Sequence, residues 1–365
     1  MKPKVDAFPD DVKTGAPSPV NRSTPTAGER RFSAVQVAPK KPKPALVQIG
    51  TRMARSASGI RSAGVPDLSV AKSPARHVLC LSVAIAQITI IGTGLIGGSL
   101  GLALKTHGYK GRIVGCDRIP VLERAHRESA IDFGVANPVD AVRGSQVIVL
   151  ATPIGAIIDL IELLGRALPA KTLLTDVGST KSEIVARALK VFGKAAGKRF
   201  LAGHPMAGKE NSGVENADPN LFQDAAWLVT PLPSQNTDDG LCGEFLEWVE
   251  KIGAKVAEID AKKHDYLCAW ISHLPQMMST ALAASLVEEF GEDAPLLLPG
   301  GRALREMTRI SASPYSMWRD VALTNKKNLQ KCLLKLEQRL AHIRENLDTR
   351  ELALEFERAH QLKKT

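Results

Sequence analysis

From residue 88 onward, short apolar runs alternate with segments of helical periodicity. The runs are rich in Val, Ile and Leu, and glycine or a polar residue closes most of them, which is typical of buried strands. They lie at residues 88–92, 112–117, 146–152, 172–178, 200–204, 226–231 and 254–259. Helical segments, among them 95–108, 120–130 and 245–253, separate several of the runs. This alternation predicts an α/β fold with a doubly wound, Rossmann-type parallel sheet over residues 88–260.

The pattern changes after residue 261, where no strand signal remains, and an all-α domain is expected over residues 261–365. Residues 264–290 are apolar on most sides, which is typical of a buried helix, and Pro275 is expected to kink it because proline removes a backbone donor. The last helix carries an apolar seam with alternating spacings of four and three residues: Leu329, Leu333, Leu336, Leu340, Ile343 and Leu347. Such a seam packs against another helix. An intrachain contact would satisfy it; we favour a subunit interface, because one small helical domain has little else to cover it.

Residues 1–87 lack apolar periodicity and are rich in Pro, Ala, Ser and Lys, so they are expected to form a disordered basic tail. They hold 14 Lys and Arg residues but only 5 Asp and Glu. The rest of the chain holds 34 basic and 33 acidic residues and is therefore nearly neutral. The pI of about 9.4 therefore comes from the tail. A nearly neutral folded part argues against a nucleic-acid partner, since basic groups that bind nucleic acid should lie on the folded domain.

The apolar run at residues 78–91 is too short to cross a bilayer, which takes about 20 residues. It also lies too far from Met1 for a signal peptide. No membrane association is expected, and a cytoplasmic protein is the simplest interpretation. An organelle transit peptide in the acid-poor tail and a misassigned start both stay open. The five cysteines form no C-x-x-C pair, so reduced thiols are expected, and no His, Cys and Asp cluster has metal-ligand spacing.

A dinucleotide site is expected where the first strand meets the first helix. Gly92, Gly94 and Gly97 form a G-x-G-x-x-G pattern that follows a strand and opens a helix, which is the context this motif requires. The glycines permit a tight turn, close approach of a pyrophosphate and close helix–strand packing, and the helix N-terminus faces the phosphates. Leu95 and Ile96 belong to the same expected site.

Asp117 ends the second strand, 20 residues after Gly97. An acid at this place accepts hydrogen bonds from the ribose hydroxyls and repels a 2′-phosphate, which favours NAD over NADP. Arg118 follows directly and would soften that preference, so NADP stays possible. Thr152 and Pro153, at the end of a later strand, complete the expected cofactor site.

Three further stretches carry candidate chemistry. "TDVGSTK" (175–181) places Ser179 at the carboxyl edge of the sheet, where ligands bind in open α/β folds, although a serine before a helix often serves only as an N-cap. "GHPMAGKENSGVE" (203–215) is a loop that carries a histidine and an acid. The third stretch, 300–320, offers arginines beside apolar residues, an arrangement typical of arginine paired with an anion.

Together these stretches resemble the prephenate/arogenate (cyclohexadienyl) dehydrogenase family, the tyrosine-branch enzymes of aromatic amino-acid biosynthesis. The resemblance covers about residues 88–345 and rests on "GTGLIGGSLG", "DVGSTK", "GHPMAGKENSGVE", "HDYLCAWISHLPQ" and "MTRISASPYSMWRD", in the family's order. It implies oxidative decarboxylation of prephenate to 4-hydroxyphenylpyruvate, or of arogenate to tyrosine, with NAD. No lysine lies between Lys263 and Lys326, which disfavours a β-hydroxyacid dehydrogenase; a non-catalytic NAD-binding regulatory protein is a further alternative.

The resemblance also assigns roles to residues. His204 matches the catalytic histidine that hydrogen-bonds the C4 hydroxyl of the substrate ring, and Ser179 matches the serine at the same hydroxyl. Arg309 matches the arginine that clamps a substrate carboxylate, and Glu210 an acid that pairs with it and gates the pocket. Trp318 matches a tryptophan that reaches the neighbouring subunit's site, which implies a homodimer built through the helical domain.

Two positions depart from the family pattern. Gln276 stands where some members carry a second histidine, and Glu306 stands where an aspartate is familiar. The choice between prephenate and arogenate therefore stays open, as does feedback by tyrosine. His273 is included as a pocket wall, although a histidine on an apolar helix is often only a core residue. His264 is interpreted as a helix-start residue outside the site.

Overall fold

The computed structural model describes residues 71–72, 85–169, 171–291 and 299–363. The chain divides into two units, Met1–Arg61 and Ser62–Thr365, and every described residue belongs to the second. Most of the expected basic tail therefore lies outside the described residues. Within them, no helix is long and apolar enough to cross a membrane.

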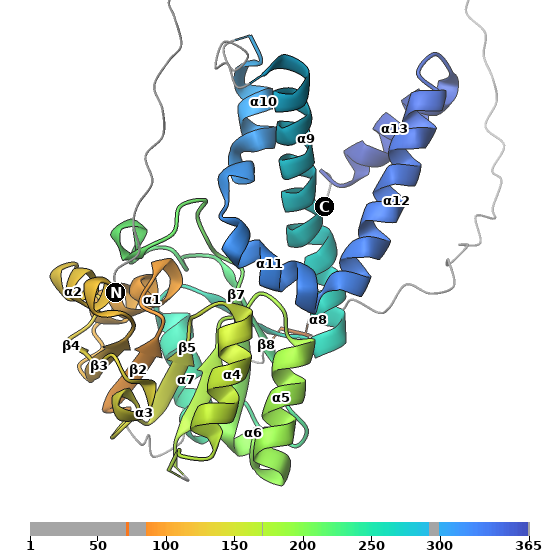
Figure 1. Cartoon of the computed structure of the whole chain (residues 1–365). Helices are drawn as coiled ribbons and strands as arrows, with labels where there is room; N and C mark the ends of the chain where they lie inside the picture. The colour runs from red at the N-terminus through yellow and green to blue at the C-terminus, as the bar shows by residue number, and fades with distance from the viewer. Residues whose placement is uncertain (1–70, 73–84, 170, 292–298, 364–365) are drawn as a thin grey trace, which may run out of the picture. The chain divides into compact units, whose positions relative to one another are not determined.

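The described strands form one sheet of nine in the order β1-β9-β8-β7-β6-β5-β2-β3-β4 (Figure 1). The bounds are β1 Ala71–Lys72, β2 Gln87–Ile91, β3 Arg112–Cys116, β4 Phe133–Gly134, β5 Val147–Leu150, β6 Leu173–Asp176, β7 Phe200–Pro205, β8 Ala226–Thr230 and β9 Lys255–Glu258. Parallel pairing dominates, but β8 runs antiparallel to β7, and β1 antiparallel to β9. The expected doubly wound, mainly parallel sheet is confirmed, and these two antiparallel pairs are additions that the sequence pattern did not predict. Between β7 and β8 the chain forms only the 3₁₀ turn η2 (Val214–Asn216), so no helix carries it back across the sheet.

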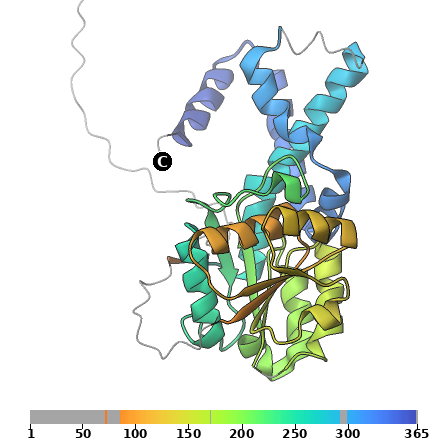
Figure 2. The ribbon, with the colours of Figure 1, turned by 90° about the vertical axis from the view of Figure 1, so that its left-hand side faces the viewer.

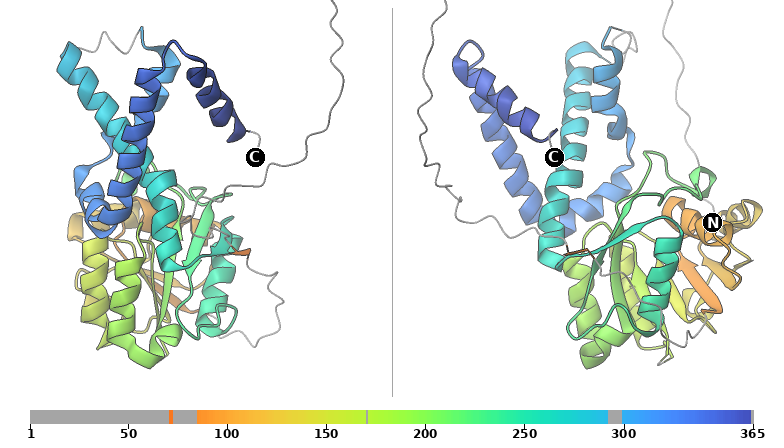
Figure 3. Two further views of the ribbon diagram at one scale, coloured as in Figure 1. Left: turned by 90° about the vertical axis from the view of Figure 1, so that its right-hand side faces the viewer. Right: turned by 180° about the vertical axis from the view of Figure 1, so that it is seen from behind.

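Helices cover both faces of the sheet, as the alternating pattern predicts. One face holds α1 (Leu95–Thr106), α2 (Ile119–Arg127) and α7 (Gly240–Lys251); the other holds α3 (Pro138–Ala141), α4 (Ile154–Gly165), α5 (Ser182–Phe192) and α6 (Ala196–Arg199), the last after a 3₁₀ turn, η1 (Gly193–Ala195). α4 and α5 lie in front of the sheet in Figure 1, and α7 lies in front of it in the view from behind in Figure 3 (right). Figure 2 views the molecule from the side of α1 and α2.

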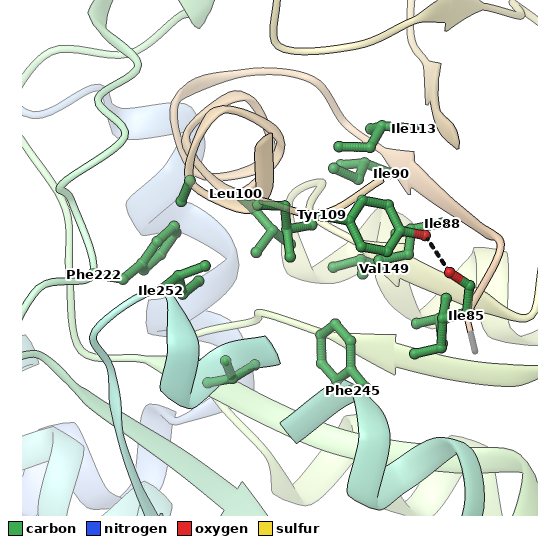
Figure 4. Close-up of a cluster of buried hydrophobic side chains, with 14 of the residues drawn as sticks. Ile85, Ile88, Ile90, Leu100, Tyr109, Ile113, Val149, Phe222, Phe245 and Ile252 are labelled. Carbon is green, nitrogen blue, oxygen red and sulfur yellow. Dashed lines mark hydrogen bonds between the residues drawn. The ribbon is translucent and has the colours of Figure 1, made fainter. Parts of the chain in front are cut away.

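Successive residues of one strand fill two separate cores. In β5, Val147 and Val149 lie in the cluster under α1 and α7, and Ile148 and Leu150 lie in the cluster under α4 and α5. Side chains alternate across a strand with period two, so a strand buried on both faces reads as continuously apolar. Figure 4 shows part of the first cluster, in which the Tyr109 hydroxyl donates to the Ile85 carbonyl at 2.9 Å.

Order in the fold begins before residue 88. Ile85 is 4% exposed and belongs to the first core, and its amide donates to Glu244 at 2.5 Å. Ala71 and Lys72 pair with β9 as the edge strand β1. These positions fall inside the segment expected to be disordered, so the expected boundary at residue 87 is wrong for them.

The C-terminal segment is helical throughout its described part (Figure 1). It comprises α8 (Ala261–Cys268), the π-helical η3 (Ala269–His273), α9 (Leu274–Phe290), α10 (Gly301–Thr308), the 3₁₀ turn η5 (Arg309–Ala312), α11 (Tyr315–Thr324), α12 (Lys326–Glu345) and α13 (Arg350–Gln361). Pro275 lies in the first turn of α9, directly after the π-helical residues, where the helical hydrogen-bond pattern changes. The kink expected at Pro275 stays a prediction. The expectation of a buried helix is wrong for the end of α9, where Val287 is 49% and Phe290 55% exposed.

The apolar seam of the last long helix divides in two. Leu333 and Leu336 pack against the cluster of Ala269, Leu274 and Cys332, which is an intrachain contact. Farther along the chain, Leu340 is 54% and Leu347 63% exposed. The subunit contact predicted from the spacing could therefore involve only the exposed part of the seam, at Leu340 and Leu347.

Acids from the helical segment cap two helices of the sheet domain. Asp320 accepts the Gly155 amide at the start of α4 at 2.9 Å. Asp265 accepts the amides of Lys181 and Ser182 at the start of α5 at 2.7 and 2.9 Å. Neither helix has a side-chain cap of its own at its N-cap residue. Each acid satisfies amides that a helix start leaves without partners, and so it fixes the helical segment against the carboxyl edge of the sheet.

Candidate active site

The glycine loop has the geometry that its sequence predicts. Gly92 has φ +95°, which favours glycine, and a methyl group on it would lie 2.5 Å from the Ala151 carbonyl oxygen. A methyl group on Gly97 would lie 2.0 Å from the Gly92 oxygen, so the helix and the turn touch there. Around Gly94 the corresponding position has no atom within 4 Å. Protein atoms therefore fill the space beside Gly92 and Gly97, whereas the space beside Gly94 is free for a ligand.

The residues around this loop fit a dinucleotide. The Asp117 carboxylate accepts the amides of Thr93 and Arg118 at 2.9 and 2.8 Å, which holds it beside the loop. Thr93 and Thr152 each bury a hydroxyl that has no hydrogen-bond partner in the structure. Such hydroxyls require a partner, and a bound cofactor would supply one. Leu95 and Ile96 open α1, and Pro153 immediately precedes α4, so all the predicted cofactor residues lie at the carboxyl edges of β2, β3 and β5.

His204 lies near the end of β7 and is 7% exposed. Its Nδ1 lies 2.9 Å from Nε2 of His264, and Nδ1 of His264 lies 2.9 Å from Oδ1 of Asp265. His264 and Asp265 are fixed by α8, which starts at Ala261 and is capped by the Asp260 side chain. Three side chains from two distant elements therefore form one buried hydrogen-bonded row.

Burial controls the charges in this row. It lowers the pKa of His204 well below its usual value, and the neighbouring His264 and Lys181 lower it further. Burial likewise lowers the pKa of His264. Burial alone would raise the pKa of Asp265, but hydrogen bonds from His264, Ser182 and Lys181 outweigh it and leave that pKa below its usual value. At neutral pH the row is therefore one carboxylate and two neutral imidazoles.

Ser179 follows β6 and is half-buried, in a loop held by a buried ion pair. The Lys181 ammonium lies 2.5 Å from Asp176, both side chains are fully buried, and Asp176 also accepts the Gly178 amide at 2.8 Å. The backbone of Ser179 lies beside the His273 ring. Within the described part of the chain, Ser179 and His204 form no hydrogen bond with each other, so the predicted role of Ser179 stays a prediction.

The predicted pocket residues of the helical segment lie in two groups. His273 is buried, its pKa is lowered by burial to about 4, and its ring meets that of Trp318 edge-on at 6.0 Å. Gln276 is buried and donates to the Ile310 carbonyl at 2.8 Å, next to Arg309. Trp318 thus packs within its own chain, and its predicted reach into a neighbouring subunit stays a prediction.

Arg309 and Glu210 form the ion pair that the resemblance implies. The Arg309 guanidinium lies 3.0 Å from the Glu210 carboxylate, and both side chains are partly exposed. The backbone of Glu210 and the charge of Arg309 lower the pKa of Glu210. Lys209, beside it, donates to Asp218 and to the Asn216 carbonyl at 3.0 and 3.2 Å. Lys209 therefore braces the loop that carries Glu210.

His264 is the site residue that the sequence interpretation missed. Its place in a helix start is correct, but its side chain is fully buried against His204. One signal was available: His264 and Cys268 are four residues apart on one helix. With His204 they place three ligand atoms within 4.8 Å of one another, a group that could hold a metal ion. The two imidazole nitrogens of that group already share a hydrogen bond, and the expected absence of a metal site stays a prediction.

A glycine loop on a doubly wound sheet, an acid after the next strand and a buried histidine facing a helical domain define an NAD-dependent dehydrogenase. Residues 100–258 match the family model of the prephenate dehydrogenase nucleotide-binding domain, and residues 260–359 match that of its dimerization domain. The chain belongs to the prephenate dehydrogenase family.

Known relatives agree with this assignment. The chain is 35% identical to a prephenate dehydrogenase of Lactococcus lactis over 271 residues, which cover 69% of this chain and 72% of that protein. A structure of prephenate dehydrogenase from A. aeolicus with hydroxyphenyl propionate and NAD⁺ has a TM-score of 0.66 at 29% identity, covering 79% and 99% of the two chains. Synechocystis arogenate dehydrogenase has a TM-score of 0.58 at 26% identity, covering 76% and 96%.

Proposed function

We propose that this protein oxidatively decarboxylates prephenate, arogenate or both with NAD, in the biosynthesis of tyrosine. The products are 4-hydroxyphenylpyruvate or tyrosine, together with carbon dioxide and NADH. The observation that carries the proposal is the buried, neutral His204 at the carboxyl edge of the sheet that holds the glycine loop.

The cofactor would lie over the glycine loop, with its phosphates at the start of α1 and its ribose at Asp117. When bound, NAD accepts the hydride from the ring carbon that bears the hydroxyl. The loop around Gly94 leaves the approach open, and the unpartnered hydroxyls of Thr93 and Thr152 offer polar contacts.

His204 takes the hydroxyl proton as the ring carbonyl forms. A lowered pKa keeps its imidazole neutral at physiological pH, so it is ready to accept a proton. The ring carboxylate then leaves as carbon dioxide and its bonding electrons complete the aromatic ring. Because aromatisation drives this step, the protein chiefly has to orient the substrate.

Arg309 recognises a substrate carboxylate. Its guanidinium is partly exposed and held by Glu210, so an incoming carboxylate could replace Glu210 as its partner. Gln276 donates to the carbonyl of Ile310, the residue after Arg309, and so lies close to this arginine. We assign Gln276 to recognition of the substrate side chain. We assign Ser179, His273 and Trp318 to the wall between this arginine and His204.

The protein acts as a homodimer through its helical domain. The support is the match of residues 260–359 to a dimerization domain and the exposure of large apolar side chains there. Val287, Phe290, Leu340, Leu347 and Phe356 are each about half exposed or more. Exposed apolar residues gathered on one domain mark an interaction surface.

The test supplies purified full-length protein with prephenate or arogenate and with NAD or NADP, and measures NADH or NADPH absorbance and released carbon dioxide. Equal amounts of reduced cofactor and carbon dioxide are expected with at least one substrate and NAD. His204→Asn is the matched control, which should bind NAD normally and turn over orders of magnitude more slowly. Absence of both products with both substrates would refute the proposed function.

A further inference from the structure

We propose that His264 and Asp265 are positioning residues that fix the tautomer of His204, so that its Nε2 is the atom that accepts the substrate proton. The proposal rests on the function proposed above for the identity of that substrate. The tautomer itself follows from the hydrogen bonds of the protein and is measurable without turnover.

Asp265 determines which atoms donate and which accept in the hydrogen bonds of this row. Its Oδ2 accepts the Ser182 amide, and its Oδ1 accepts the Lys181 amide as well as facing Nδ1 of His264. Two backbone donors and a lowered pKa keep this carboxylate ionised, and an ionised carboxylate only accepts hydrogen bonds. His264 must therefore carry its proton on Nδ1.

The proton on Nδ1 of His264 determines in turn which nitrogen of His204 is protonated. A neutral imidazole that has its proton on Nδ1 presents a bare Nε2, and burial keeps His264 neutral. Nε2 of His264 lies 2.9 Å from Nδ1 of His204, so Nδ1 of His204 is the donor in that hydrogen bond. Nε2 of His204 is thereby left with its lone pair, as a general base requires.

The row also receives the charge that catalysis creates. When Nε2 of His204 takes the substrate proton, the ring becomes a cation buried beside Lys181, whose own charge is balanced by Asp176. The other groups that face the row are His273, neutral at pH 7, and the Cys268 thiol, whose pKa burial raises to about 12. Asp265 is therefore the carboxylate that balances the new cation, through the polarised ring of His264.

The environment makes the positions rigid. His264 is fully buried, and Asp265 also holds the start of α5 through its two amide contacts. The Asp265 carbonyl accepts the Asn325 side chain at 2.7 Å, which ties α8 to the start of α12. A ring held on both sides cannot flip to present the other nitrogen without losing its partners.

Two substitutions separate this role from simple packing. In His264→Leu the ring is replaced by an apolar group, so Nδ1 of His204 loses its acceptor. His264→Gln keeps an amide oxygen that can accept from His204 and an amide nitrogen that can donate to Asp265. Cys268→Ala is the packing control: its sulfur lies 3.6 Å from His264 and 3.9 Å from His204, but a thiol is a much weaker donor and acceptor than the Asp265 carboxylate, so its removal should leave both tautomers as they are.

The primary readout is ¹⁵N NMR of histidine-labelled full-length protein with NAD, with His204 assigned by difference from His204→Asn. The wild type and Cys268→Ala should show His204 protonated on Nδ1 and bare on Nε2. A wild-type His204 protonated on Nε2 would overturn the proposal, even if the enzyme is active. The expected result would support it even if neither prephenate nor arogenate is the substrate, so the two proposals fail separately.

Turnover supplies the second readout. His264→Leu should lower kcat by about 100-fold or more, the scale of a general base's contribution, with NAD affinity and substrate KM within a few-fold of wild type. His264→Gln should recover most of that loss, and Cys268→Ala should stay within a few-fold. Equal losses in the Leu and Gln variants would overturn the positioning role. If the Leu variant fails to fold, the wild-type spectrum and the Gln variant still decide.

Discussion

Replacement of Gly94 or Gly97 of the glycine loop by alanine should affect two different properties. Gly94→Ala should weaken NAD binding, and Gly97→Ala should lower the stability of the fold. A methyl group at Gly97 would lie 2.0 Å from the Gly92 oxygen and 2.8 Å from a methyl group of Ile90, so the helix must move by about an ångström. Overpacking of this kind costs about 1–3 kcal/mol and can cost more against backbone. A methyl group at Gly94, where φ is −78°, meets no protein atom within 4 Å.

Gly94→Ala should therefore fold with nearly unchanged stability, but it should fill the space that a pyrophosphate needs. NAD affinity is expected to fall at least tenfold, which corresponds to about 1.4 kcal/mol. Gly97→Ala should lose about 2 kcal/mol or more of unfolding free energy. Denaturant unfolding and calorimetric titration with NAD measure the two effects on the same samples. A Gly94→Ala protein that binds NAD as the wild type does would refute the placement of the cofactor over this loop.

Four other predictions concern the cofactor, the substrate, pH and the tail. Asp117→Ala should narrow the preference for NAD over NADP in kcat/KM, since the acid no longer repels a 2′-phosphate. Arg309→Met should raise substrate KM by 10-fold to 100-fold, about the strength of a charged hydrogen bond, and leave NAD affinity unchanged. The acid limb of kcat/KM should lie below pH 6.5, because a lowered pKa keeps His204 unprotonated as the pH falls. Deleting residues 1–61 should preserve turnover, whereas deletion through residue 85 should not, because Ile85 and β1 belong to the fold.

The sequence predicted the features that depend on neighbours along the chain. The glycine loop, the acid after β3 and the positions of the seven main strands are local patterns, and each holds to within two or three residues. The antiparallel pairing of β8 with β7 could not be predicted in this way. It depends on a connection without a crossover helix, and the apolar pattern of a strand does not show in which direction the strand runs.

The part of the site that the sequence could not show depends on distant contacts. His204 and His264 are 60 residues apart, and only the tertiary fold brings Nδ1 of His204 and Nε2 of His264 to within 2.9 Å. The pairing of Glu210 with Arg309, 99 residues apart, came from family resemblance and is confirmed by the ion pair. Ile85 was assigned to the tail because its role in the core depends on Tyr109 and Glu244, which lie far along the chain.

The most direct test of the central claim is the rate of NADH formation by wild-type protein and His204→Asn, each given NAD and prephenate or arogenate. The wild type should form NADH and carbon dioxide in equal amounts, and the variant should be slower by about 100-fold to 10,000-fold with its NAD affinity intact. An unchanged rate in the variant would contradict the role of His204 as the base.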